Sequence, residues 1–128
     1  AGILGCSIVP GFDEIARRVC LRDAILRADV ILTGEGQLDS QTWCGKTVSG
    51  VVTAARQAER GVFAFAGRID ESAYEGCPPG VAIRAATPPD MTFSDARPQA
   101  GDLLTRAVVE EAPRILEMAR ELTAPKRG

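Results

Sequence analysis

The sequence predicts an α/β fold in which a parallel sheet lies between layers of helices. Short aliphatic runs alternate along the chain with stretches whose apolar residues recur at helical spacing. Such alternation favours parallel strands joined by right-handed crossovers. The length of 128 residues is typical of one domain, and 45% hydrophobic with 25% charged residues is an ordinary globular composition. We therefore expect a single α/β domain over residues 1–128.

The N-terminal part is expected to contain two helical pieces and a strand. Apolar residues from Phe12 to Val19 fall at i, i+3, i+4 and i+7, which is the stripe of an amphipathic helix. A second helical piece covers Asp23–Ala28. The aliphatic run Val30–Leu32 then leads into a glycine-rich segment, which is typical of a short buried strand ending in a loop.

The middle of the chain is expected to continue the alternation. Helical spacing runs from Val48 to about Arg60, and Gly61 is a suitable stop. The sequence "VFAFAG" at Val62–Gly67 predicts a second strand, and "VAIRAA" at Val81–Ala86 predicts a third. We expect all three strands to be parallel.

A long amphipathic helix is expected over Asp102–Leu122, and Pro113 should kink it or split it in two. The residues expected to face inward are Leu103, Leu104, Ala107, Val108, Ile115, Leu116 and Ala119. Because three strands make a small sheet, the sequence indicates an incomplete Rossmann-like fold that is completed elsewhere.

Composition excludes several functions. A net charge of -2 offers no broad surface for nucleic acid, and neither a membrane-spanning segment nor a signal segment is visible.

The four cysteines Cys6, Cys20, Cys44 and Cys77 lack zinc-site spacing, and we expect them to be reduced in the cytoplasm. With no histidine, Ser-His-Asp and Cys-His chemistry is impossible within this chain. Phosphoryl transfer remains open, because positioning and charge neutralisation carry most of it.

The segment Asp29–Val51, "DVILTGEGQLDSQTWCGKTVSGV", carries the polar residues at a predicted strand end. Its Gly-Lys-Thr resembles the end of a Walker A loop, but the first glycine of that loop would fall at Ser40. In open parallel sheets, ligands bind beyond the carboxyl ends of the strands, and the "GRID" segment after the second strand lies at the same edge. We therefore expect a phosphate-handling loop that is not a Walker A loop.

Each candidate residue in this loop has a chemical reason and a structural alternative. Gly34 and Gly36 would let the backbone approach anionic oxygens, Glu35 and Asp39 could hold Mg²⁺ or orient a hydroxyl, and Lys46 could bind phosphate. Strand-to-helix loops are also rich in Gly and Asp simply because they turn. Asp39 could cap a helical turn at 40–42.

Other polar or aromatic residues have weaker functional arguments. Trp43 is the only tryptophan and is expected to anchor the loop onto the domain. Asp70 and Glu71 are expected to be solvated.

The segment Ala28–Val51 resembles the signature of the bacterial-type glycerate kinase family. The matching pattern is T-G-E-G-x-[LI]-D-x-Q-T, two variable residues, G-K, and a helix with G-V. "VPGFDEI" at Val9–Ile15 and "AFAG" at Ala64–Gly67 also resemble family segments. The signature positions matched are Thr33, Gly34, Glu35, Gly36, Leu38, Asp39, Gln41, Thr42, Gly45, Lys46, Gly50 and Val51.

This resemblance implies ATP- and Mg²⁺-dependent phosphorylation of D-glycerate to a phosphoglycerate. It implies that Asp39, Glu35 and Lys46 are catalytic and that Glu35 and Asp39 hold the metal. The residues expected to bind substrate or phosphate are Gly34, Gly36, Ser40, Gln41 and Thr42. It further implies that this chain is the C-terminal third of a longer two-domain kinase, that it needs the remainder of the same polypeptide, and that it is inactive alone.

A second interpretation is a non-catalytic α/β nucleotide-binding or structural module. The dinucleotide fingerprint G-x-G-x-x-G is missing, since Gly34 and Gly36 are followed by Asp39 where a glycine would stand.

Overall fold

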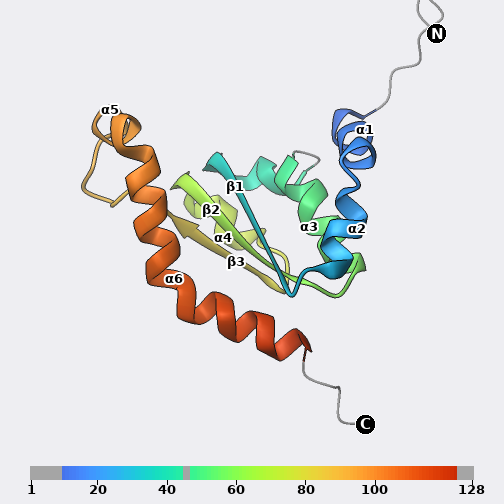
Figure 1. Cartoon of the computed structure of the whole chain (residues 1–128). Helices are drawn as coiled ribbons and strands as arrows, with labels where there is room; N and C mark the ends of the chain where they lie inside the picture. Colours follow the sequence, from blue (N-terminus) through green and yellow to red (C-terminus); the bar gives the residue numbers. More distant parts are fainter. Residues whose placement is uncertain (1–9, 45–46, 124–128) are drawn as a thin grey trace, which may run out of the picture.

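The expected α/β architecture is confirmed by a computed structural model, which describes residues 10–44 and 47–123. Within these residues the sheet has three strands in the order β1-β2-β3, all parallel. They are β1 (Val30–Leu38), β2 (Gly61–Ile69) and β3 (Val81–Ala85). The sheet is open, with β1 at one edge and β3 at the other (Figure 1).

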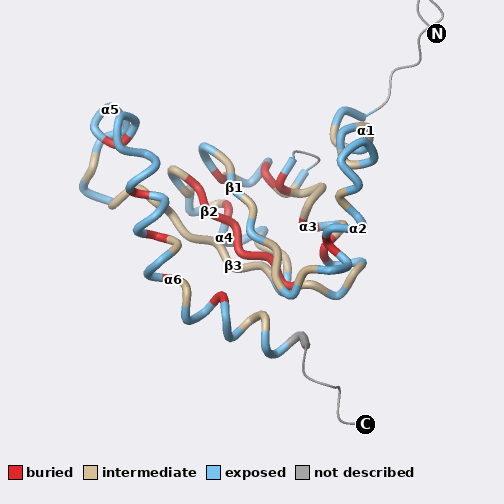
Figure 2. Tube along the Cα trace, in the orientation of Figure 1, coloured by how far each residue is buried: buried red, intermediate tan, exposed pale blue. Residues whose placement is uncertain are grey.

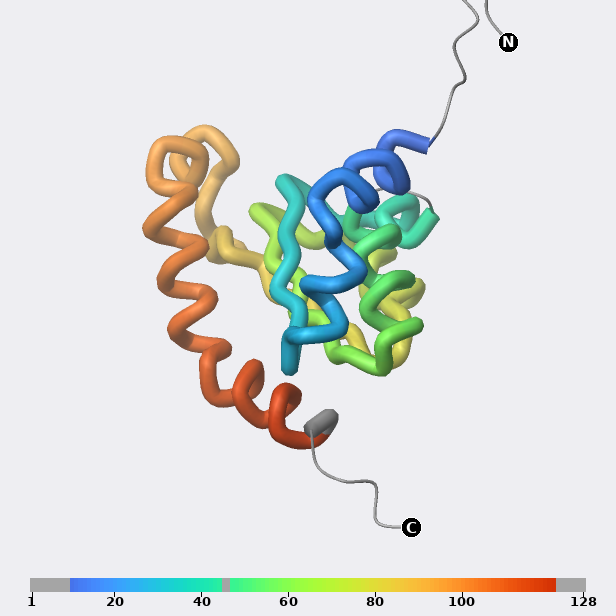
Figure 3. Tube along the Cα trace, turned by 45° about the vertical axis from the view of Figure 1, so that its right-hand side comes forward, coloured from blue at the N-terminus to red at the C-terminus, as the bar shows by residue number. Residues whose placement is uncertain are grey.

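Helices cover both faces of the sheet. Helix α3 (Thr47–Gln57) connects β1 to β2, and α4 (Glu71–Glu75) connects β2 to β3. Both pack into one core with the same face of the sheet, as right-handed crossovers from consecutive strands require. The long helix α6 (Ala100–Thr123) lies on the opposite face, as Figures 1 and 3 both show.

Strand β2 is the buried centre of the domain (Figure 2). Val62 and Ala64 pack toward α3, while Phe63 and Phe65 pack toward α6. The two phenylalanine rings are stacked with centroids 5.0 Å apart. This alternation gives the sheet one apolar core on each face, which explains why the strand reads as a continuous apolar run.

Ion pairs connect the middle of α6 to β3. Arg84 Nη2 lies 2.9 Å from Glu110 Oε2, and Arg84 Nε lies 3.4 Å from Glu111 Oε1. Glu111 is buried and also pairs with Arg114 Nη1 at 2.9 Å. The Arg114 guanidinium lies 5.7 Å from the centroid of the Phe63 ring, within the range of a cation–π contact. These contacts fix the position of α6 relative to the sheet.

Helix α6 continues through Pro113 as one element and bends along its length (Figure 1), so Pro113 does not split it in two. The inward face was predicted too broadly, because Leu104 is 44% and Leu116 is 56% exposed. The predicted residues that are buried are Leu103, Ala107 and Ile115. The sheet is too narrow to cover the whole apolar stripe of this helix.

Across residues 10–44 and 47–123, no helix is both long enough and apolar enough to cross a bilayer.

The first two helices lie beside α3 at the β1 side of the domain (Figures 1 and 3). They are α1 (Gly11–Arg18) and α2 (Leu21–Arg27), close to the predicted ranges. Phe12 of α1 packs against Gly50 of α3 so closely that a Cβ at Gly50 would lie 2.6 Å from ring carbons. The glycine at this position therefore lets α1 dock onto α3.

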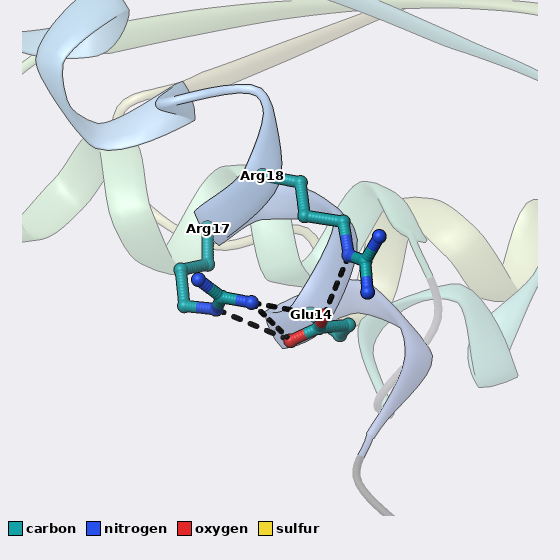
Figure 4. Close-up of polar contacts among 3 residues, drawn as sticks. All are labelled: Glu14, Arg17 and Arg18. Atoms are coloured by element: carbon teal, nitrogen blue, oxygen red, sulfur yellow. Dashed lines mark hydrogen bonds and ion pairs between the residues drawn. The ribbon is translucent and has the colours of Figure 1, made fainter.

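An exposed cluster of charges stabilises α1 locally (Figure 4). Glu14 accepts hydrogen bonds from Arg17 Nη2 at 3.0 Å and from Arg18 Nε at 2.6 Å. The Arg17 contact first, and the Arg18 contact second, lower the pKa of Glu14 below its usual value. Such solvent-exposed pairs contribute little to global stability, so they support the helix rather than the fold.

Helices α3 and α4 differ from the sequence prediction. Helix α3 ends at Gln57 instead of near Arg60, because Glu59 adopts a left-handed conformation (φ 53°) and the Arg60 N–H turns back to Ala55 O at 2.9 Å. The polar stretch around Glu71, where no helix was predicted, forms α4. The remaining short elements are the 3₁₀ turns η1 (Ser40–Trp43) and η2 (Arg97–Gln99) and the helix α5 (Phe93–Ala96).

Strands β1 and β2 approach closely near their carboxyl ends. A Cβ placed on Gly67 would lie 2.7 Å from Gly36 O, and one on Gly34 would lie 3.0 Å from Phe65 O. Only the first of these distances is too short for any real Cβ contact. The pair Gly36 and Gly67 therefore marks the point where a side chain would push the two backbones apart.

We expect Gly67→Ala to lower the free energy of unfolding by about 1–3 kcal/mol, the usual cost of overpacking a close contact. Urea denaturation measures this value. The control Gly101→Ala lies in α6 with open space around its Cβ position, so it should leave stability unchanged or raise it by up to about 1 kcal/mol. Equal stability of both variants would show that β1 and β2 can separate here without cost.

Candidate functional site

The glycine- and acid-rich segment lies inside β1 and not in a loop. The strand was predicted to end at Leu32, but its pairing with β2 continues to Leu38, which lies opposite Ile69. Likewise Gly67 and Arg68 belong to β2. Because glycine has a low strand propensity, the sequence pattern predicted an early end of the strand. In the structure, pairing with the central strand β2 extends it. The predicted loop, residues 33–42, was therefore wrong for residues 33–38, which belong to β1.

Glu35 has a buried carboxylate oxygen that is not satisfied. Its register partner is Ala66, a residue of the core on the α3 face, so the Glu35 side chain leaves the sheet on that face. Oε2 is buried and has no hydrogen-bond partner among the described residues. A buried acceptor without a donor is costly, and it suits a cation or a donor group brought by a ligand or by further polypeptide.

Gly36, in contrast to Gly34, has no neighbour within 4 Å of its Cβ position. Packing inside the described residues does not require a glycine there. The open space beside Gly36 therefore permits close approach of a group from outside these residues.

The same segment of β1 forms one wall of a groove of about 640 Å³ against α6. Phe65 and Gly67 of β2 form its floor, and Leu104 and Val108 of α6 form the other wall. The groove is largely apolar. Its full lining is Leu32, Thr33, Gly34, Glu35, Gly36, Phe65, Ala66, Gly67, Ala86, Ala100, Leu104 and Val108.

Asp39 caps the turn η1, the structural role that its residue type allowed. Its Oδ1 accepts the N–H groups of Gln41 at 2.9 Å and Thr42 at 3.1 Å. The Asp39 N–H in turn donates to Thr42 Oγ1 at 2.9 Å, which completes a capping box. Thr42 is fully buried, so it holds the segment in place. Gln41 is exposed.

A hydrogen-bonded link joins the ends of β1 and β2. The Ser40 N–H donates to Ser72 Oγ at 3.1 Å, and the Ser72 hydroxyl donates to Asp70 Oδ1 at 2.7 Å. Bonds from the Ser72 hydroxyl, and then from its N–H, lower the pKa of Asp70 below its usual value. Asp70 is exposed as expected, but it has a defined role as the N-cap of α4. Sequence reasoning did not identify Ser72, because its partner is distant in the chain.

Trp43 anchors this segment onto the domain, as expected. Its Nε1–H donates to Ala73 O at 3.0 Å, and its ring packs against Gly76, where a Cβ would lie 2.8 Å from Cδ1. The polar residues 39–42 are thus held between β1, α4 and the core.

Two predicted residues, Gly45 and Lys46, lie outside the described residues. In the part of the chain that the structure describes, no group of three or more Cys, Asp or Glu side chains is arranged to hold a metal ion. Cys20, Cys44 and Cys77 are free thiols in that part.

A second pocket, of about 510 Å³, adjoins the groove and shares Gly67 and Ala86 with it. Three arginines line it: Arg68 of β2, Arg84 of β3 and Arg106 of α6. Sequence reasoning missed these residues, since they come from three distant elements. The available signal was a charged residue near the end of each of two buried strands.

Together these features define an open parallel α/β domain whose polar groups collect at the carboxyl ends of its strands, the usual ligand-binding edge of this class. The family model described as "Glycerate kinase family" matches residues 1–116. The chain belongs to the glycerate kinase family.

Curated relatives agree with this assignment. A glycerate kinase of Halalkalibacterium halodurans is 31% identical over 105 residues, covering 81% of this chain and 28% of the relative. A glycerate kinase of Bacillus subtilis is 31% identical over 124 residues, covering 90% of this chain and 32% of the relative. One from Haemophilus influenzae is 41% identical over 61 residues, covering 48% and 16%. The chain thus spans about a third of the length of the first two relatives. No solved structure matches it.

The capping role of Asp39 gives a testable stability prediction. Asp39→Ala removes the acceptor for two N–H groups and should lower the free energy of unfolding by about 1 kcal/mol, whereas Asp39→Asn keeps an acceptor and should change it by only a few tenths of that. Fluorescence of Trp43 during urea denaturation reports unfolding. An equal loss in both variants would mean that the charge of Asp39 stabilises the fold and that the cap does not.

Proposed function

We propose that this chain is the C-terminal part of a longer, two-domain, cytoplasmic glycerate kinase. The intact enzyme transfers a phosphoryl group from ATP to a hydroxyl of D-glycerate and gives a phosphoglycerate. The observation that carries this proposal is the unsatisfied Oε2 of Glu35, buried at the strand end that bears the family signature. The printed names of the relatives supply the substrate and the reaction class.

Glu35 is the residue best suited to hold Mg²⁺ in this proposal. Carboxylate oxygen is the ligand that Mg²⁺ prefers, and a bound cation would satisfy the orphaned Oε2. Mg²⁺ bound to ATP supplies charge neutralisation at the transferring phosphoryl group. The described residues provide no cluster of three such ligands, so waters, nucleotide phosphates or the remainder of the polypeptide would complete the coordination.

Asp39 has two tasks in the proposal. One oxygen positions η1 through the capping box, and the carboxylate as a whole orients the glycerate hydroxyl or assists Glu35 with the metal. Gly34 and Gly36 allow close approach, while Ser40, Gln41 and Thr42 present or position donors for substrate or phosphate. Lys46 is proposed to bind phosphate, on the signature alone.

The short span of the chain favours a second candidate, a non-catalytic α/β module that binds nucleotide or completes a larger fold. A calorimetric titration with ATP, with and without Mg²⁺, separates the two. Binding that requires Mg²⁺ supports the kinase, and absence of any nucleotide binding supports a structural module.

In the natural polypeptide that contains this chain, we expect Asp39→Asn to reduce turnover by on the order of 10²-fold or more, the range for a positioned acid–base group. Stability should barely change because the cap is retained. Steady-state glycerate phosphorylation measures the effect. Asp13→Asn, an exposed aspartate of α1, carries the same charge change and should keep full turnover. Unchanged turnover in Asp39→Asn would limit Asp39 to its capping role.

We also expect the 128-residue chain alone to show no phosphorylation of D-glycerate with Mg-ATP. Donor and acceptor must be enclosed from two sides to align the transfer and exclude water, and this chain supplies one wall of such a site. A coupled assay for ADP release tests this. Product formation that disappears in Asp39→Asn would overturn the expectation, because a contaminating kinase would be insensitive to that substitution.

A further inference from the structure

The arginine-lined pocket has a charge imbalance that its surroundings do not correct. Arg68, Arg84 and Arg106 line it, and Glu110 is the one carboxylate in its lining. Glu110 already pairs with Arg84 at 2.9 Å. Within the described residues, Arg68 and Arg106 make no side-chain hydrogen bond or ion pair. The pocket therefore presents two uncompensated guanidinium groups.

Arg84 itself is only partly satisfied. Its Nε is buried and lies 3.4 Å from Glu111 Oε1, within ion-pair distance, yet this nitrogen donates no hydrogen bond to any described residue. Guanidinium groups converging from two neighbouring strands and a facing helix form a suitable receptor for oxyanions, because each can donate two parallel N–H bonds to one group.

The size and walls of the pocket indicate which oxyanion it takes. Its volume of about 510 Å³ far exceeds a three-carbon acid and lies in the range of pockets for drug-sized ligands. Pro88, Pro89 and Met91 give one wall an apolar surface. A ligand with a ring at one end and a chain of anionic groups at the other matches this combination.

We propose that this pocket binds the polyphosphate of a nucleoside triphosphate, with Arg68 and Arg106 as the principal phosphate ligands. The proposal rests on the proposed kinase function, which needs such a donor. The pocket shares Gly67 and Ala86 with the groove that Gly34 and Gly36 of β1 line, so a triphosphate held by the arginines lies beside the signature strand on the face of the sheet that α6 covers. Arg84 connects the site to α6 through Glu110 and Glu111.

The test measures binding of a non-hydrolysable ATP analogue, with Mg²⁺, to the natural polypeptide that contains this chain. Isothermal titration calorimetry compares the wild type with Arg68→Gln, Arg106→Gln and the double variant. Both arginines are exposed, and neither side chain has a hydrogen bond or ion pair among the described residues, so the variants should fold normally. We expect each single change to weaken binding by at least about tenfold, as loss of a charged hydrogen bond does.

Arg56→Gln is the matched control. It removes the same charge from an exposed arginine of α3, the helix on the opposite face of the sheet, and should bind the analogue like the wild type. Circular dichroism of each variant tests whether the native helix content is kept.

Three other outcomes overturn the proposal. Equal analogue affinity in all variants means that the nucleotide binds elsewhere, and the kinase function still stands if D-glycerate is phosphorylated. Weakened binding of D-glycerate with unchanged binding of the analogue assigns the arginines to the carboxylate of the acceptor. Absence of analogue binding in the wild type would contradict both the binding site and the proposed use of ATP. A different result, tight and arginine-dependent binding without phosphorylation of D-glycerate, would support the binding site and contradict the proposed kinase function.

Discussion

The close approach of two backbones at Gly36 and Gly67 is the constraint on which the functional edge depends. With a Cβ at Gly67 only 2.7 Å from Gly36 O, no side chain fits between the strands. Because the strands stay together here, pairing continues to Leu38 and Ile69, and the Asp70 N–H can reach Leu38 O at 2.9 Å. The segments that follow the two strands then start side by side, which places the Ser40 N–H within reach of Ser72 Oγ.

The signature residues separate into those that the fold explains and those that it does not. Thr42 is fully buried in the capping box, Gly50 makes room for Phe12, and Gly34 lies close to the backbone of β2. Any domain with this packing would need them. Among the described residues, Oε2 of Glu35 is buried without a hydrogen-bond partner and Gly36 has open space on its side-chain side, and packing explains neither. These two residues therefore give the strongest argument for a functional role. Both are expected to lower the stability of the domain, and no local contact compensates for that loss.

Sequence patterns predicted what local rules determine and missed what distant pairing determines. The three parallel strands, α1 and the bent α6 follow from apolar periodicity, Pro113 and the alternation of elements. The end of β1 could not be predicted from these patterns. Glycine has a low strand propensity, but pairing with the buried central strand β2 overrides that preference. The position of Asp39 as a cap was accessible from its residue type and spacing. The pocket lined by Arg68, Arg84 and Arg106 could not be predicted from the sequence. These residues come together through the register of the strands and the position in which α6 packs on the sheet.

Strand β1 forms an open edge of the sheet within the described residues. Strand β1 has nine residues and pairs only with β2 among the described residues, and Leu32 within it is 50% exposed. Long, apolar edge strands are usually shielded, because their free backbone groups recruit other strands. Under the proposed function, the remainder of the kinase polypeptide would shield this edge. Such a segment would also cover the groove between β1 and α6, so completing the sheet and enclosing the reactants would be a single structural event.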